Sequence, residues 1–167
     1  NVLVGGLAGD ALTDADDNVA IGTTALSADT LGSRSVAIGK EALAAQNFTT
    51  ATNSYNTAVG AFSGNAVSTG TLNTLVGGLA GQQLTTGVQN TLVGASVGDA
   101  LTDADYNVAI GKEALTTDTK GNKSVAVGMG ALGTQNFTTS TDSYNTAVGH
   151  NACLLYTSPS PRDGLLS

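Results

Sequence analysis

Apolar and polar residues follow a fixed order in a five-residue motif that recurs throughout this chain. The motif begins with Asn or Ser, continues with Val or Thr, then Ala or Leu, then Val or Ile, and ends with Gly. Recurrence at nearly constant spacing predicts stacked, near-identical coils, which are typical of a solenoid. Nine copies, in steps of 17 or 21 residues, begin at Asn1, Asn18, Ser35, Asn56, Asn73, Asn90, Asn107, Ser124 and Asn145.

The motif has the pattern of a short strand that is apolar on both faces. Its second and fourth positions share one face, and its third position lies on the other. Such a strand is typical of burial on two sides. We therefore expect one face to line the coil interior and another copy of the chain to cover the second. We expect Val93, in the fourth position, to face the interior.

Gly and Asn occupy columns of the repeat that indicate structural roles. Gly closes all nine copies, which predicts a corner that needs positive φ or leaves no room for a Cβ atom. Asn opens seven copies, and its short amide side chain can stack in ladders between coils.

The rest of the coil occurs in two versions that conserve bulk. One version has Gly in the second half of the coil and an apolar residue three positions later. The other version has Leu in place of that Gly, as at Leu26, Leu43, Leu115 and Leu132. A 17-residue coil can hold two strands of about five residues and two turns, giving a rod of roughly 40 Å at about 4.8 Å per coil. Residues 40–46 and 112–117 have helical propensity, but we expect stacking to override it.

Composition and charge narrow the function classes. Only 4% of the residues are aromatic and Trp is absent, which suits a thin solenoid core. The formal charge of −7 and the scatter of the Lys and Arg residues exclude a nucleic-acid partner. No apolar run approaches the roughly 20 residues of a membrane helix, so we expect no direct membrane insertion by this stretch.

The repeat pattern ends at Ala152, so residues 1–152 are predicted to form the solenoid. Residues 153–167 follow none of the pattern and are read as a translated sequencing adapter, with a genuine Pro-containing linker as the alternative. The chain begins on a motif and without Met, and we interpret it as part of a longer protein.

Two coils are 21 residues long, and their four extra residues must bulge outward. The loops 46–55 and 135–144 also concentrate aromatic residues on an aromatic-poor chain, which favours a binding surface. In the alternative interpretation, the Phe residues cap the core and the Tyr residues seal a junction between chains. The candidate ligand-contacting residues are Asn47, Phe48, Tyr55, Asn136, Phe137 and Tyr144.

The motifs N-T-A-V-G, N-V-A-I-G and S-V-A-I-G-K-E-A-L, at this spacing, resemble the head repeats of trimeric autotransporter adhesins, the YadA-like head family. The resemblance extends over nearly all of residues 1–152. It implies an all-β, left-handed parallel β-roll of about nine coils, a homotrimer, and display on the bacterial cell surface. Partners would be host matrix, a cell-surface protein or glycan, or other bacteria. No ligand-contacting residue carries over, because the shared motif consists of packing positions.

The sequence has partial features of three other functions. Asp10, Asp14, Asp16 and Asp17, with Asp99, Asp103 and Asp105, offer oxygen ligands but lack the spacing of known Ca²⁺ loops. Asp14 and Asp103 would lie about five layers, roughly 24 Å, apart, which is too far for a glycosidase pair. The second motif column mixes Thr with Val, unlike an ice-binding array. We therefore expect no catalytic, metal or cofactor residues and no enzymatic activity.

These patterns favour a non-enzymatic adhesin head, with a segment of a phage tail fibre as the alternative, which would place the chain on a virion. The full open reading frame would separate the two, because a coiled-coil stalk followed by four amphipathic strands indicates the adhesin. A terminal fibre-assembly module indicates the phage.

Overall fold

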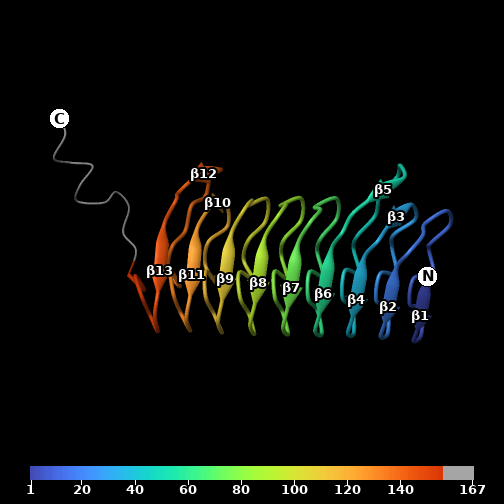
Figure 1. Cartoon of the computed structure of the whole chain (residues 1–167), viewed down its shortest axis with the longest axis horizontal. Coiled ribbons are helices and arrows are strands. Elements are labelled where there is room, and N and C mark those ends of the chain that lie inside the picture. Colours follow the sequence, from blue (N-terminus) through green and yellow to red (C-terminus); the bar gives the residue numbers. More distant parts are fainter. Residues whose placement is uncertain (156–167) are drawn as a thin grey trace.

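The computed structural model describes residues 1–155, which form a rod of stacked coils (Figure 1). Each coil contributes one strand to a nine-stranded parallel sheet in the order β1-β2-β4-β6-β7-β8-β9-β11-β13. Register is conserved from coil to coil, since each motif residue pairs with the same motif position in the next coil, as Leu75 pairs with Leu92. The predicted all-β parallel solenoid of about nine coils is confirmed.

The sheet strands are three residues long and coincide with motif positions two to four. They are β1 (Val2–Val4), β2 (Val19–Ile21), β4 (Val36–Ile38), β6 (Thr57–Val59), β7 (Thr74–Val76), β8 (Thr91–Val93), β9 (Val108–Ile110), β11 (Val125–Val127) and β13 (Thr146–Val148). Two separate pairs, β3 (Gly32–Ser33) with β5 (Thr52–Asn53) and β10 (Gly121–Asn122) with β12 (Thr141–Asp142), connect each long coil to the coil before it. Residues 1–155 contain no helix, and so none that could cross a membrane.

The expectation of two five-residue strands per coil was wrong, because the return half of the coil is mostly irregular. Thr24, Leu26 and Arg34 all have φ between 53° and 65°, and equivalent residues in other coils share this conformation. Positive φ is uncommon outside Gly and interrupts an extended backbone. Bonds between coils hold it in place, as from Leu26 N to Ala42 O at 3.0 Å. The segments with helical propensity form turns, so stacking does override propensity.

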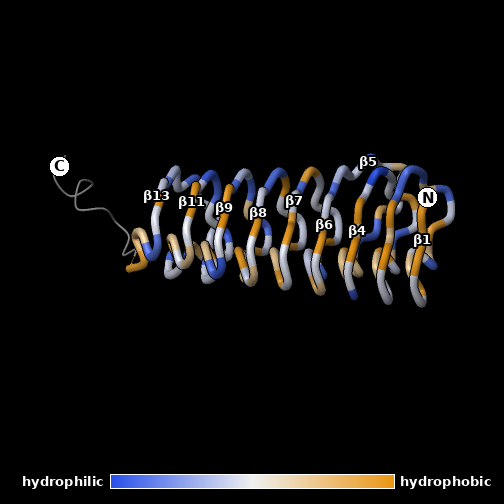
Figure 2. Tube along the Cα trace, turned by 60° about the horizontal axis from the view of Figure 1, so that its bottom comes forward, coloured by the Kyte–Doolittle hydropathy of each residue, from blue (hydrophilic) through white to orange (hydrophobic). Residues whose placement is uncertain are grey.

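The third motif position faces the interior, and the second and fourth face outward. Leu92 is fully buried, whereas the neighbouring Val93 is only half-buried. The expectation that Val93 faces the interior was therefore wrong. The sequence left both faces apolar, so alternation alone could not choose between them. Figure 2 shows the apolar residues following the strands along the rod.

The exchange of Gly for Leu in the return half fills one continuous core. A Cβ added at Gly64 would lie 3.0 Å from Leu43 Cδ2 and 2.6 Å from Leu75 Cδ1, so neighbouring coils already occupy that space. Coils with Leu at this position have a polar residue three positions later. That residue is Asp29, Gln46, Asp118 or Gln135, and all four are fully buried.

Candidate binding edge

The two long coils project from the same edge of the rod. Their outer strands, β5 and β12, lie toward opposite ends in Figure 1. The coils that contain them begin at Ser35 and Ser124, 89 residues apart. The structure therefore presents two equivalent loops along a single edge.

A buried carboxylate fixes the start of the first loop. Asp29 Oδ1 accepts hydrogen bonds from the backbone N–H of Gly32 and of Phe48, both at 3.0 Å. Asp29 Oδ2 accepts from Gln46 Nε2 at 2.5 Å. These three donors compensate for removing the carboxylate from water. The first residues of the loop are thereby anchored to the preceding coil.

Gln46 also supplies the amide that the Asn ladder lacks at Ser35. In most steps the motif Asn accepts from the next motif, as Asn73 Oδ1 accepts from Asn90 N at 3.0 Å and from Asn90 Nδ2 at 3.1 Å. Ser35 has no amide, and Gln46 Oε1 accepts from Asn56 Nδ2 at 2.9 Å instead. Gln46 Nε2 donates to Ser35 Oγ at 2.8 Å. The predicted Asn ladder is confirmed, with Gln46 as its substitute rung.

The second long coil repeats this arrangement. Asp118 Oδ1 accepts from Gly121 N at 3.1 Å and from Phe137 N at 2.9 Å. Gln135 donates to the Asp118 carboxylate and to Ser124 Oγ. The same network at both sites links the Ser-for-Asn exchange, the buried Asp–Gln pair and the longer coil.

The candidate residues divide between surface and core. Phe48 is 6% exposed, and its ring fills the space beside Gly32 that a Cβ would occupy. Phe137 is half-buried in the equivalent place. Asn47, Asn136, Tyr55 and Tyr144 are exposed, with the Tyr residues 48% and 67% accessible. The exposed members of the six are thus the two Asn and the two Tyr residues.

The exposed Tyr of each long coil is paired with a cation from the preceding coil. Arg34 lies over the Tyr55 ring at 5.6 Å from its centroid, and its Nη1 donates to the Tyr55 hydroxyl at 2.5 Å. That hydrogen bond raises the pKa of Arg34. Lys123 lies 5.1 Å from the Tyr144 centroid and donates to Asp142 Oδ2 at 2.5 Å. The edge therefore combines aromatic rings with cations.

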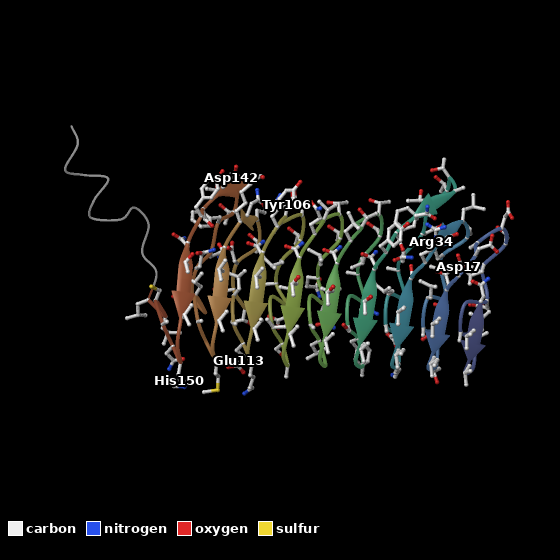
Figure 3. The ribbon with its side chains drawn as sticks, viewed as in Figure 1. Asp17, Arg34, Tyr106, Glu113, Asp142 and His150 are labelled. Atoms are coloured by element: carbon white, nitrogen blue, oxygen red, sulfur yellow. The ribbon has the colours of Figure 1, made fainter. Side chains whose placement is uncertain are left out.

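These residues belong to a longer column that the sequence reading missed. The last residue of each of the first eight coils has φ between 50° and 65°, which places equivalent side chains in line. Leu72 and Tyr106 are 48% and 50% exposed, and Figure 3 shows Tyr106 on the same edge as Asp142. The signal was present, because each of these residues directly precedes a motif. We call this set the edge column: Asp17, Arg34, Tyr55, Leu72, Gln89, Tyr106, Lys123 and Tyr144.

The acidic residues of the second cluster, Asp99, Asp103 and Asp105, each have an ordinary partner. Lys120 Nζ lies 3.5 Å from Asp103 Oδ2, Asp105 Oδ1 accepts from Val88 N at 2.8 Å, and Asp99 accepts from a Thr hydroxyl. His150 lies on the opposite edge (Figure 3). Within residues 1–155, no three His, Cys, Asp or Glu side chains form a group that could hold a metal ion.

Comparisons with protein-family models, curated proteins and solved structures give no match for this chain. The functional argument therefore depends on the residues and their arrangement. Residues 156–167, which contain most of the predicted adapter segment, lie outside the described part of the chain.

The Lys123–Asp142 pair gives a prediction about ionisation. The hydrogen bond from Lys123 lowers the pKa of Asp142 below its ordinary 3.8. The ionised Asp142 carboxylate therefore stabilises the folded state above pH 3.8, and this stabilisation is lost as the pH falls through the lower pKa of the folded state. In Lys123→Gln we expect the Asp142 pKa to rise toward 3.8 in an NMR carboxyl titration.

Lys112→Gln is the matched control, because Lys112 pairs with Glu113 on the other edge and should leave the Asp142 titration unchanged. Both pairs are exposed, so neither substitution should shift the melting temperature much. An unchanged Asp142 pKa in Lys123→Gln would contradict the pairing.

Proposed function

We propose that residues 1–152 form the non-enzymatic head of a trimeric adhesin displayed on a bacterial surface. The observation that carries this proposal is the outer face of the nine-stranded sheet. In all nine coils, motif positions two and four are half-buried or exposed, and all are Val, Ile or Thr. Position four is Val or Ile in every coil, and a continuous apolar column of this length marks an interaction surface.

Two further copies of the chain are the proposed cover for this face. Every coil presents the same two columns, so three identical rods around a parallel axis would match coil to coil along their full length. No charged residue interrupts the columns, whereas the chain as a whole carries a charge of −7 that opposes association elsewhere. The left-handed β-roll implied by the family resemblance is part of the same proposal.

Light scattering at micromolar concentration is expected to give three times the chain mass. Val93→Asp should reduce that mass to one chain while leaving the coils folded, because it places a carboxylate on the outer face. Ala95→Asp, at an exposed turn beside it, should remain trimeric.

A well-folded monomer in the parent protein would contradict the trimer. A fused trimeric coiled coil is the control for an assembly that depends on a stalk. If the rods also remain unassociated within the fusion, the proposal fails. That result would appear as equal melting temperatures for the fused parent and the fused Val93→Asp variant.

The edge column and the two loops are the proposed surface for host matrix, a cell-surface protein or glycan, or other bacteria. They place exposed Tyr rings beside cations at repeated intervals, a composition typical of binding surfaces. A threefold assembly would present six loops, and many weak contacts raise avidity.

Adhesion of protein-coated beads to extracellular-matrix proteins and to cultured epithelial cells tests this surface. Tyr55→Ala with Tyr144→Ala is expected to lower bead retention severalfold without changing the melting temperature, since both rings are exposed. Tyr106→Ala, in a 17-residue coil, separates the contribution of the loops from that of the rest of the edge column. An equal loss in Tyr106→Ala would assign binding to the whole column rather than to the loops.

Deleting residues 49–52 and 138–141 restores the 17-residue step and tests the loops as units. Intact adhesion in a folded double deletion would reject the loops as the binding site. A collapse of the melting temperature would identify them as structural instead.

A further inference from the structure

Three Asn residues begin the tripeptide Asn-X-Ser/Thr, which is the acceptor sequence for N-linked sugars. They are Asn47-Phe48-Thr49, Asn136-Phe137-Thr138 and Asn122-Lys123-Ser124. The sequence motif alone does not distinguish among the three. Their surroundings do, because an acceptor needs an accessible amide nitrogen and an accessible hydroxyl two residues later.

Asn47 and Asn136 both have this accessibility. Each is exposed in a loop of a long coil. In each side-chain amide only Oδ1 is engaged, accepting from Thr30 Oγ1 at 3.1 Å in Asn47 and from Thr119 Oγ1 at 3.4 Å in Asn136. Among residues 1–155, neither Asn47 Nδ2 nor Asn136 Nδ2 has a hydrogen-bond partner. The nucleophilic atom of each side chain is therefore unengaged at the surface.

The hydroxyl residues of these two tripeptides are equally accessible. Thr49 and Thr138 are exposed, and no hydrogen bond engages either hydroxyl within the described residues. Both follow a Phe that packs toward the core, which holds the Asn on the outside of the rod. The duplicated geometry argues that the two tripeptides are equivalent sites.

Asn122 is in the opposite situation. It is 7% exposed, and its Nδ2 donates to Ser140 Oγ at 3.1 Å and to Asp142 Oδ1 at 3.4 Å. Its Oδ1 accepts from Asp105 N at 2.8 Å. An amide held on both sides in this way cannot reach an enzyme while the rod is folded.

We propose that Asn47 and Asn136 are acceptor sites for N-linked glycosylation. The donor is a sugar activated at C1 as a nucleotide or lipid-linked diphosphate, and a glycosyltransferase of the producing cell supplies the catalytic groups. Asn Nδ2 attacks C1, forming the C1–N bond. The C1–O bond breaks with its electron pair on the diphosphate, and the amide proton passes to a base of the enzyme. Asn47 and Asn136 lie in the same two loops as Tyr55 and Tyr144. Their assignment as acceptor sites does not depend on the proposed adhesive function.

The experiment incubates the folded chain with UDP-glucose and a soluble N-glycosyltransferase specific for Asn-X-Ser/Thr. Mass spectrometry is expected to show two added hexoses, on the peptides containing Asn47 and Asn136, and none on Asn122. Asn47→Gln and Thr49→Ala should each remove one hexose. Thr50→Ala, one residue outside the tripeptide, should remove none, and circular dichroism should show all three variants folded.

A chain that is unfolded in urea and kept from refolding during the reaction should gain a third hexose at Asn122. This gain would show that burial protects Asn122 in the folded rod. Two results would overturn the proposal. One is a folded chain without hexose under conditions that modify a free Asn-Phe-Thr peptide. The other is modification of Asn122 in the folded rod to the same extent as Asn47.

Discussion

Replacing Leu92 with Asp is expected to unfold the middle of the rod, lowering the melting temperature by tens of degrees or preventing folding. Leu92 is fully buried. A Cβ atom added at Gly81 would lie 3.0 Å from Leu92 Cδ1, and one added at Gly98 would lie 3.1 Å from it, so the Leu92 side chain already fills the space between these coils. A carboxylate there would have no partner, and an unpaired buried charge costs several kcal/mol. Circular dichroism with temperature or urea measures the loss.

Val93→Asp provides the matched comparison, because it introduces the same charge one residue later on the same strand. Its side chain points to the outer face, so the coils should fold and only the assembly should be lost. Equal unfolding of a single chain by both substitutions would contradict the assignment of inner and outer faces.

Gly94→Ala is expected to produce the second large loss of stability. Gly94 has a φ of 143°, and a Cβ there would lie 2.6 Å from Gly111 O and 2.7 Å from Gly111 C. These are backbone atoms of the next coil, which bonds to β8 through Gly111 N and Val93 O at 2.8 Å, so they cannot move aside without breaking the stack. Strained backbone conformations cost about 1–3 kcal/mol, and the contact adds to that cost.

Gly78→Ala is the control for Gly94→Ala. Gly78 directly follows the motif Gly of its coil, and a Cβ added there meets no atom within 4 Å. The melting temperature should therefore be unchanged in Gly78→Ala and much lower in Gly94→Ala. Similar melting temperatures in the two variants would show that the corner tolerates a side chain.

The features that the sequence predicted well are those repeated in every coil. The motif strand, the Gly corner and the Asn ladder each recur often enough that one stacking geometry must satisfy all copies. Which face of the strand points inward was not predictable from alternation, because Leu92 and Val93 are both apolar. The decisive difference is that the inner column is restricted to Ala and Leu, opposite Gly or Leu in the return half, which requires knowing how the coil closes.

The least predictable features depend on contacts between unlike positions. Gln46 replaces a rung of the Asn ladder because Ser35, eleven residues earlier, interrupts it, and no local pattern links the two residues. In the loops, local composition did not separate Phe48 from Tyr55. Their burial is decided by Asp29, whose carboxylate holds the Phe48 backbone against the preceding coil.

The conserved register between coils also bears on how such a chain can change its length. Removing residues 73–89 would join Leu72 to Asn90 and bring β6 beside β8, a pairing of the same kind as the one that β7 makes with each of them. Duplicating those residues would be equally neutral, since the inserted coil meets only copies of its former neighbours. Unequal recombination between the repeats of the gene could therefore lengthen or shorten the rod in whole coils, changing the reach of the molecule without creating a new interface.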